Sequence, residues 1–166
     1  MELLKPNIYQ KDIYSINYQN LKKRNIKNLL FDIDNTIASN KEKTPNKKVI
    51  ELFDNLKKQG FNLYIITNSL KNRALTFGNK LNIKTYYFSI KPLSKNYLKL
   101  IKENNLKKEE CAAIGDQLFT DIKGANKLNI LSILVDPIDS KEFITTKINR
   151  LKENKTKIIK RGEYYE

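Results

Sequence analysis

Short apolar runs alternate along the chain with longer segments in which apolar residues recur at helical spacing. The apolar runs predict five strands, at residues 28–31, 61–66, 86–88, 111–114 and 131–135. The periodic segments predict helices that run from Thr44-Pro45 to Gly60 and lie near residues 74–81, 94–101 and 122–128. In the helix after Ser94 we expect Leu98 and Ile101 to face the core. Strands separated by single helices predict an α/β fold, a three-layer, Rossmann-like sandwich around a central, mainly parallel five-stranded sheet.

The connections between these elements are too short to contain another domain. One helix and its loops occupy the residues from Asp34 to Thr67, and one helix and one strand occupy those from Thr67 to Lys91. We therefore expect no large cap domain over the carboxyl ends of the strands, where parallel sheets bind their ligands. A site left open in this way suits a bulky ligand, or a partner that closes it.

The formal net charge of +14 raises nucleic acid and anionic lipid as partners. The basic residues are almost all Lys, however, and Arg, which supplies bidentate recognition of phosphates and bases, occurs at only four positions. The clearest basic concentration runs from Lys147 to Arg161. A Lys-, Asn- and Ile-rich composition typical of an A+T-rich coding sequence explains the charge equally well. Nucleic acid is therefore a partner that no motif supports.

The chain shows no sign of export. The residues Met1 to Pro6 lack the apolar run of a signal peptide, and no stretch approaches the roughly 20 apolar residues of a membrane-spanning helix. The single cysteine, Cys111, cannot form an internal disulfide, and its apolar neighbours predict a buried, inert thiol. We expect a cytoplasmic protein.

Polar, chemically capable residues follow four of the predicted strands. They are Asp32, Thr67, Lys91 and Asp116. Because the carboxyl ends of parallel strands lie along one edge, we expect these side chains in one crevice. Taken singly, Thr67 reads as a helix cap and Lys91 as a solvated lysine, but their occurrence together with the acids favours a site.

Two carboxylates, Asp32 and Asp34, stand two residues apart at a strand end, where they repel each other unless a cation is near. Asp116 could complete its coordination. A chain without His that offers Asp oxygens suits Mg²⁺. An EF-hand loop also begins in this way, but Ile37 and Lys43 occupy the positions that need Gly and Glu.

Groups suited to phosphate lie beside these acids. Thr67-Asn68-Ser69 immediately precedes a predicted helix, whose free backbone N–H groups bind anions, and the Thr67 hydroxyl adds a donor. Lys91 supplies a positive charge for phosphoryl oxygens or for a carboxylate nucleophile. With no His available, Asp34 is the best-placed group for proton transfer.

The set of motifs resembles the haloacid dehalogenase (HAD) superfamily. The motifs are Asp32-x-Asp34-x-Thr36, Thr67, Lys91, and Gly115-Asp116 with Asp121, in that order. The resemblance implies a phosphatase in which Asp32 attacks phosphorus and Asp34 acts as general acid and then general base. It implies Mg²⁺ held by the Asp32 carboxylate, the Asp34 backbone carbonyl and Asp116. Thr67 and Lys91 would hold the phosphoryl group. Asp121 would assist from a position just outside the residues that touch the metal and the phosphoryl group.

Asp-x-Asp-Asn-Thr, Lys91-Pro92 and Gly115-Asp116-Gln117-x-x-Thr120-Asp121 resemble more narrowly the bacterial YqeG family of HAD subfamily IIIA. Relatives of that family include phosphatidylglycerophosphate phosphatases, which suggests a phosphorylated lipid head group as substrate and peripheral contact with an anionic membrane at its inner face. Residues 1–166 then form one HAD-like domain, with an N-terminal lead (1–27), a catalytic core (28–136) and a basic C-terminal segment (137–166).

Two other classes of protein compete with this interpretation. A receiver-type signalling switch also combines acids, a Thr and a Lys, but its phosphate-accepting Asp lies two strands after its acid pair, whereas here Gly115-Asp116 follows the Lys. A catalytically weak HAD-fold protein could instead bind RNA, ribosomes or a membrane through its basic surface. The presence of Asp32, Asp34 and Asp116 together argues against a loss of catalysis. A protein that both catalyses and binds such a partner stays open.

Overall fold

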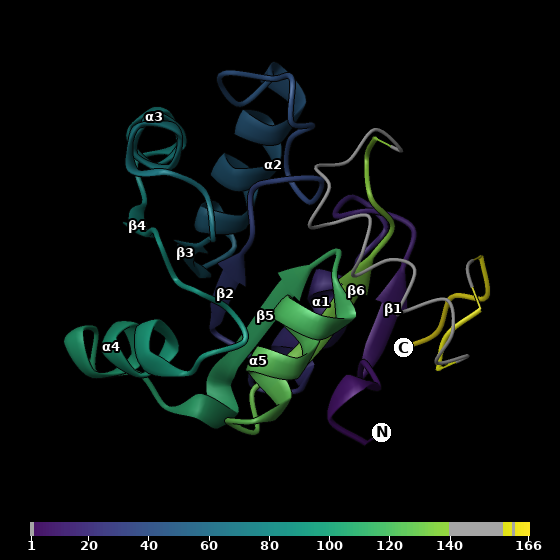
Figure 1. The fold of residues 1–166 in the computed structure, drawn as a ribbon. Coiled ribbons are helices and arrows are strands. Elements are labelled where there is room, and N and C mark those ends of the chain that lie inside the picture. The colour runs from purple at the N-terminus through teal and green to yellow at the C-terminus, as the bar shows by residue number, and fades with distance from the viewer. Residues whose placement is uncertain (1, 140–157, 161) are drawn as a thin grey trace.

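The structure, a computed structural model, describes residues 2–139, 158–160 and 162–166. A single six-stranded sheet has the order β1-β6-β5-β2-β3-β4, and every neighbouring pair is parallel (Figure 1). The strands are β1 (Ile8–Gln10), β2 (Asn28–Phe31), β3 (Asn62–Ile66), β4 (Lys84–Tyr86), β5 (Cys111–Gly115) and β6 (Leu131–Val135). The α/β class and the parallel sheet are therefore confirmed.

The predicted number of strands was too small by one. The sixth strand, β1, comes from the N-terminal lead and lies at the edge beside β6, with Ile8 opposite Ile133. The backbone N–H of Asn7 donates to the carbonyl of Ser132 at 3.0 Å and starts this pairing. Three residues are too few to show a recognisable period in a sequence, which is why the strand was missed.

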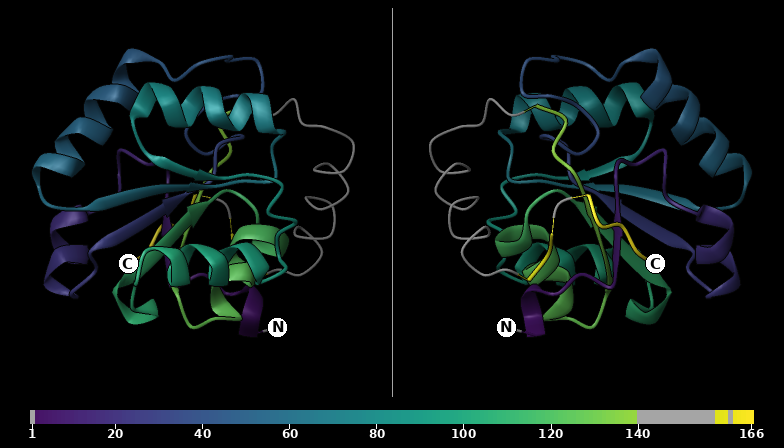
Figure 2. Two further views of the ribbon diagram at one scale, coloured as in Figure 1. Left: turned by 90° about the vertical axis from the view of Figure 1, so that its left-hand side faces the viewer. Right: turned by 90° about the vertical axis from the view of Figure 1, so that its right-hand side faces the viewer.

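Helices cover both faces of the sheet (Figure 2). The helices are α1 (Tyr18–Lys23), α2 (Lys47–Lys58), α3 (Lys71–Leu81), α4 (Lys95–Glu103) and α5 (Lys123–Asn126), with a π-helix at Leu118–Ile122 and short 3₁₀ turns at Glu2–Leu4 and Lys108–Glu110. Side chains of α1, α2 and α3 pack on one face, and those of α4 and α5 pack on the other. The three-layer sandwich is confirmed, and the described residues include no large cap.

The central strand β2 shows why the apolar runs were continuous. Leu29 and Phe31 point into the core beneath α2 and α3, whereas Leu30 points into the core beneath α4. Successive side chains of a strand face opposite sides, so a strand covered on both faces needs apolar residues at every position. Burial on both sides fixes β2, and with it the position of the residue that follows.

Several element boundaries differ from the predictions. Helix α2 begins after Asn46, whose side chain accepts from the backbone N–H of Val49 at 3.0 Å, and not at Thr44-Pro45. Gly60 follows it with a φ of +92°, as expected for a residue after a helix C-terminus. The third predicted strand, 86–88, is formed by Lys84–Tyr86. An Asn cap satisfies an early N–H group as well as Thr does, and so the sequence left both starts available.

Two helix assignments also change. In α4 the buried side chains are Tyr97 and Leu100, and Leu98, which was expected to face the core, is exposed. The predicted helix at 122–128 is shorter, at Lys123–Asn126, and follows directly from the π-helix. The single-residue shift in α4 turns Leu98 outward because neighbouring residues on a helix lie about 100° apart.

The end of the described chain returns to the first strand. Tyr9 forms an antiparallel bridge with Tyr165, and the hydroxyl groups of Tyr9 and Tyr164 donate to Asp136 at 2.6 and 2.7 Å. Most of the basic concentration from Lys147 to Arg161 lies outside the described residues. Among the residues that are described, no helix has the length and apolar character needed to cross a bilayer.

Candidate active site

The sheet brings the expected side chains to one edge. Asp32 directly follows β2, Thr67 follows β3 and Asp116 follows β5, and these three strands are neighbours. Lys91 lies on the connection from β4 to α4, and Asp121 lies on the π-helix after β5. Because all the strands run in the same direction, their carboxyl ends open into one crevice.

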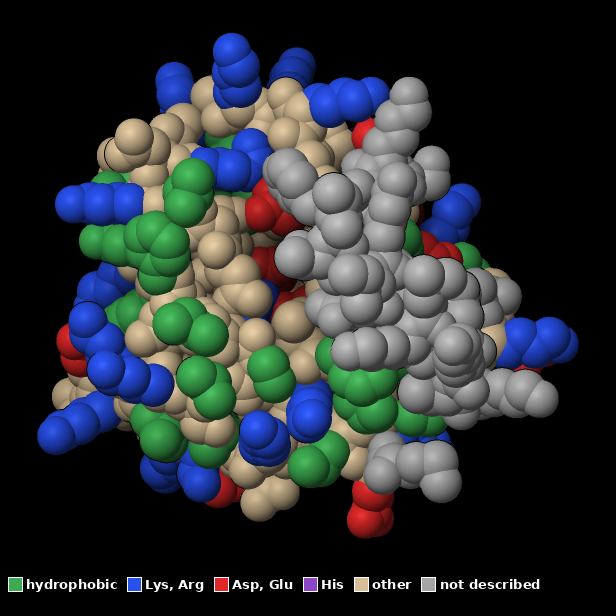
Figure 3. All heavy atoms as spheres, in the orientation of Figure 1, with side chains coloured by type: hydrophobic (Ala, Val, Ile, Leu, Met, Phe, Trp, Pro, Cys, Tyr) green, Lys and Arg blue, Asp and Glu red, His purple; other side chains and the backbone are tan. Residues whose placement is uncertain are grey.

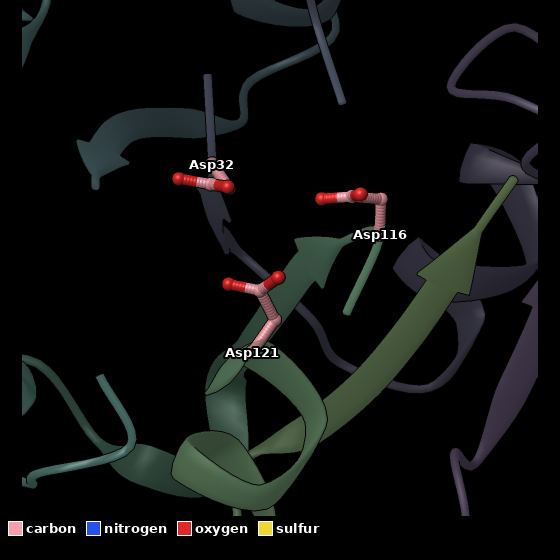
Figure 4. A group of neighbouring side chains, drawn as sticks. All are labelled: Asp32, Asp116 and Asp121. Carbon is pink, nitrogen blue, oxygen red and sulfur yellow. The ribbon is translucent and has the colours of Figure 1, made fainter. Parts of the chain in front are cut away.

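Three carboxyl groups meet at this edge. Asp32, Asp116 and Asp121 are buried, and each offers a carboxylate oxygen that lies within 4.8 Å of the others. Figure 4 shows the three side chains converging from the ends of β2 and β5 and from the turn after β5. The Thr36 hydroxyl donates to Oδ1 of Asp116 at 3.3 Å. Three oxygen donors converging on one point match the ligand chemistry of a hard divalent cation such as Mg²⁺.

Lys91 is a buried cation within this acidic cluster. Its Nζ lies 2.9 Å from Oδ1 of Asp32 and also contacts Oδ1 of Asp121. Burial disfavours the charged amine, but the carboxylates of Asp121 and Asp32 outweigh that effect and raise the pKa of Lys91 above its ordinary value. The lysine is therefore a permanent positive charge of the site and not a solvated surface residue.

The charge on Asp32 is finely balanced. Burial raises the pKa of its carboxyl group to about 6, Lys91 opposes the rise, and Asp121 and Asp34 add to it. Among the described residues, the cluster brings the Lys91 ammonium ion together with three carboxyl groups. A divalent cation would stabilise the ionised form of these carboxylates, and the three oxygen donors fit Mg²⁺.

Gly115 allows Asp121 to enter the cluster. A Cβ atom at this position would lie 2.3 Å from Cγ of Asp121, far inside van der Waals contact. Oδ2 of Asp121 accepts from the backbone N–H of Gln117 at 3.1 Å, which fixes the carboxyl group across the end of β5. The residue before Asp116 must therefore lack a side chain.

Asp34 lies beside the cluster and is held by different partners. Its Oδ1 accepts from Nε of Arg73 at 2.8 Å, and its Oδ2 accepts from the Ser69 hydroxyl. Arg73 also donates to the backbone carbonyls of Ser39 (3.0 Å) and Glu42. One guanidinium group on α3 thus fixes both the Asp34 carboxylate and the loop that follows it. The carboxylate of Asp34 is not among the three that converge.

The roles of Ser69 and Arg73 were not predicted from the sequence. Ser69 stood in the motif Thr67-Asn68-Ser69 but was assigned no contact, and Arg73 was noted only as one of four Arg residues. The sequence did contain a signal for Arg73. Arg is scarce in this chain, and an Arg in a stretch otherwise rich in Lys suggests a position that needs a planar group with several donors.

The Thr67-Asn68-Ser69 segment is a folded turn before α3. The Thr67 hydroxyl is buried and accepts from the backbone N–H of Ser69 at 3.2 Å. Asn68 is exposed, and its Oδ1 accepts from the backbone N–H of Lys91 at 2.8 Å. The residue that caps α3 is Leu70, without a side-chain bond, so Thr67 is not the helix cap. The turn joins the β3 end to the segment that carries Lys91.

Comparison with known proteins agrees with this architecture. The family model described as haloacid dehalogenase-like hydrolase matches residues 37–129. The chain is 34% identical over 150 residues to the Bacillus subtilis (strain 168) protein named Probable phosphatase YqeG, covering 90% of this chain and 87% of that protein. This protein therefore belongs to the haloacid dehalogenase-like hydrolase family, and its similarity to the Bacillus subtilis protein extends over nearly its whole length.

Solved structures show the same fold at low sequence identity. An uncharacterized protein from Listeria monocytogenes serotype 4b matches with a TM-score of 0.56 and 15% identity, over 74% of this chain and 88% of that chain. A HAD phosphatase from Thermococcus onnurineus matches with a TM-score of 0.51 and 20% identity, over 60% of this chain and 50% of that chain. Proteins of known structure therefore share the fold of this chain.

Proposed function

We propose that this protein is a Mg²⁺-dependent phosphomonoester hydrolase that works through an aspartyl-phosphate on Asp32. The observation that carries the proposal is the buried Asp32 carboxylate, which lies 2.9 Å from the Lys91 ammonium group inside a cluster completed by Asp116 and Asp121. The family assignment and the likeness to a protein named as a phosphatase point to the same chemistry.

Asp32 is the nucleophile in this proposal. An oxygen of its carboxylate attacks phosphorus, the bond from phosphorus to the ester oxygen breaks, and the leaving oxygen takes a proton from Asp34. Water then attacks the phosphorus of the acyl phosphate, Asp34 accepts a proton from that water, and the bond between phosphorus and Asp32 breaks. Inorganic phosphate leaves, and both carboxyl groups return to their starting state.

The remaining groups bind and orient the phosphate. Lys91 carries a fixed charge that holds the Asp32 carboxylate and stabilises phosphoryl oxygens. Thr67 and Asn68 lie at the end of β3, and in this proposal the Thr67 hydroxyl and the Asn68 side-chain amide bind the phosphoryl group. Mg²⁺ would be held by the carboxylates of Asp32 and Asp116 together with the Asp34 backbone carbonyl, with Asp121 behind them. When bound, Mg²⁺ neutralises charge on the phosphoryl oxygens.

The substrate that suits an uncapped site is bulky. We propose a phosphorylated lipid head group, such as phosphatidylglycerophosphate, approached by a cytoplasmic protein in peripheral contact with the inner face of an anionic membrane. Three features support it: the absence of a large cap among the described residues, the net charge of +14, and the resemblance to the YqeG family, whose relatives include phosphatidylglycerophosphate phosphatases. A weakly catalytic protein that binds RNA or ribosomes is the alternative, and turnover separates the two.

The first test is phosphate release from an aryl phosphate with and without Mg²⁺, by the parent protein and by Asp32→Asn. Turnover that requires Mg²⁺ and is lost in Asp32→Asn supports the mechanism and justifies a panel of phosphorylated lipids. Turnover that persists in Asp32→Asn rejects Asp32 as the nucleophile. If neither the aryl phosphate nor any lipid phosphate is hydrolysed, the binding alternative replaces the phosphatase.

A further inference from the structure

Large apolar side chains are exposed beside the acidic cluster, on and around the connection from β4 to α4. They are Leu70, Phe88, Ile90, Leu93 and Leu98, with 67, 53, 65, 55 and 49% of their surface exposed. We call these five residues the apolar rim. Figure 3 shows hydrophobic side chains gathered on this face, next to a hollow with acidic side chains in it. Single exposed apolar residues are ordinary, but a group beside a site marks an interaction surface.

The backbone holds part of the apolar rim in an outward-facing position. Phe88 and Ile90 are exposed, whereas Ser89 between them is buried and donates from its backbone N–H to the carbonyl of Thr67 at 3.0 Å. The Asn96 side chain donates to the Ser89 hydroxyl at 3.2 Å. Phe88 and Ile90 have φ values of +46° and +45°, a region that bulky residues rarely adopt and that clusters at functional sites. The loop is thus fixed from inside while it displays two large apolar groups.

The stretch of chain that carries the apolar rim is rich in lysine. Between Asp54 and Glu103 the chain has no acidic residue, and residues 55–102 contain nine Lys and one Arg. Four exposed lysines lie close to rim residues in the chain or on the same helix: Lys71, Lys84, Lys95 and Lys99. Aliphatic and aromatic groups that neighbour lysines in the chain complement the boundary between the anionic head groups and the acyl chains of a bilayer.

We propose that the apolar rim seats this protein on an anionic lipid bilayer, with the acidic cluster facing the head groups. Lys91 directly follows Ile90, so a bilayer that takes up the rim brings lipid-borne phosphates next to the catalytic lysine. The assignment of those phosphates as substrate rests on the proposed function. Adsorption itself requires no turnover and no metal, and can therefore be tested separately.

The other occupants of this surface fit less well. A second copy, docked through the same face, would bring the same lysines against each other, since a two-fold interface pairs like with like. Nucleic acid is recognised by Arg and by stacked aromatic rings, whereas Leu70, Ile90 and Leu93 offer aliphatic groups that gain little from phosphates. The combination of aliphatic side chains and lysines favours lipid.

The test is co-sedimentation of the full chain with vesicles, in EDTA. One set of vesicles contains phosphatidylcholine alone, and the other contains phosphatidylcholine with phosphatidylglycerol. The proteins are the parent, the triple variant Phe88→Asn/Ile90→Asn/Leu93→Asn, and the control Leu3→Asn, whose side chain is also exposed but lies in the N-terminal 3₁₀ turn. Asn tolerates positive φ, so the triple variant removes the apolar groups without adding backbone strain at residues 88 and 90.

We expect the parent and Leu3→Asn to bind the anionic vesicles and the triple variant to bind them at least about tenfold more weakly. Equal binding by the triple variant and the parent, or no binding by the parent, overturns the proposal. Two other results would also overturn it if the parent does not bind vesicles. One is an oligomer that the parent forms and the triple variant does not. The other is a complex with RNA that the parent forms and the triple variant does not.

Hydrolysis of a soluble aryl phosphate separates this proposal from the proposed function. The triple variant should hydrolyse it as the parent does, because no rim side chain has a role in the proposed chemistry. Rim-dependent vesicle binding without any turnover would reject the phosphatase and keep the docking surface. Turnover without vesicle binding would reject the docking surface and keep the phosphatase.

Discussion

The Nζ atom of Lys91 lies 2.9 Å from Oδ1 of Asp32, in an ion pair whose side chains are 2% and 8% exposed. The same ammonium group contacts Asp121, so one lysine balances two of the three buried carboxylates. Lys91→Met removes that charge and leaves the carboxylates unpaired. We predict that it lowers the free energy of unfolding by about 3–5 kcal/mol, measured by urea denaturation in EDTA, and abolishes phosphate release.

Lys99→Met is the matched control. Lys99 is exposed and lies 3.8 Å from Glu103, and such surface pairs contribute about 0–1 kcal/mol. Adding Asp121→Asn to Lys91→Met removes one of the orphaned charges and should restore part of the lost stability. If Lys91→Met proves as stable as Lys99→Met, the buried ion pair does not hold the site together.

Arg73 is a positioning residue for Asp34. Its guanidinium group reaches Oδ1 of Asp34 at 2.8 Å and the carbonyls of Ser39 and Glu42 at the same time. Lys in its place keeps the charge but cannot make this planar set of contacts. We predict that Arg73→Lys lowers kcat by about ten- to a hundredfold and changes KM little, because Asp34 is displaced from the proton it transfers.

Steady-state kinetics with an aryl phosphate measures this split, and Lys80→Met, at the exposed end of the same helix, is the control. A rise in KM with unchanged kcat would indicate that Arg73 binds substrate and does not position the acid.

Gly115 is predicted to be essential for the cluster. The Cβ of Gly115→Ala would lie 2.3 Å from Cγ of Asp121, so either β5 or the π-helix must move. We expect a loss of about 1–3 kcal/mol in stability and a loss of the Mg²⁺-induced rise in Tm. Gly124→Ala is a milder test of the same kind, since its nearest contact is a ring atom of Tyr97 at 3.1 Å, and it should keep the Mg²⁺ response. If Mg²⁺ raises the Tm of both variants equally, the close approach of Asp121 to Gly115 is not needed to form the metal site.

Cys111 is predicted to be chemically inert in the native protein. Burial raises the pKa of its thiol to about 12, and the thiol donates to the carbonyl of Lys107. At pH 8 the reactive thiolate is therefore scarce. A chromogenic disulfide reagent should react at least about a hundredfold more slowly with the native protein than with the same protein in denaturant. Rapid labelling under native conditions would show that the β5 end opens readily.

The sheet and the order of its site residues could be predicted from the sequence because they follow from local patterns. A strand buried on both faces needs continuous apolar residues, as at positions 29–31 of β2, and a parallel arrangement places every strand end at one edge. These two facts locate Asp32, Thr67 and Asp116 without any long-range information.

The missed features depend on contacts between distant segments. Strand β1 exists because Ile8 pairs with Ile133, which is 125 residues away. The contact of Arg73 with Asp34 joins α3 to the loop after β2, and no local pattern records it. The outward turn of Phe88 and Ile90 depends on a φ value that these residue types disfavour, so propensity points away from it.

The most direct test of the central claim is to trap the phosphate on Asp32. Asp34→Asn cannot activate water, but an aryl phosphate with a good leaving group needs no acid for the first step. We predict that this variant, with Mg²⁺, releases about one equivalent of the aryl alcohol in a burst. Mass spectrometry of the acid-quenched protein should then find a phosphoryl group on Asp32. A burst with the phosphoryl group on another residue, or phosphate release without any phosphoprotein, would contradict the account.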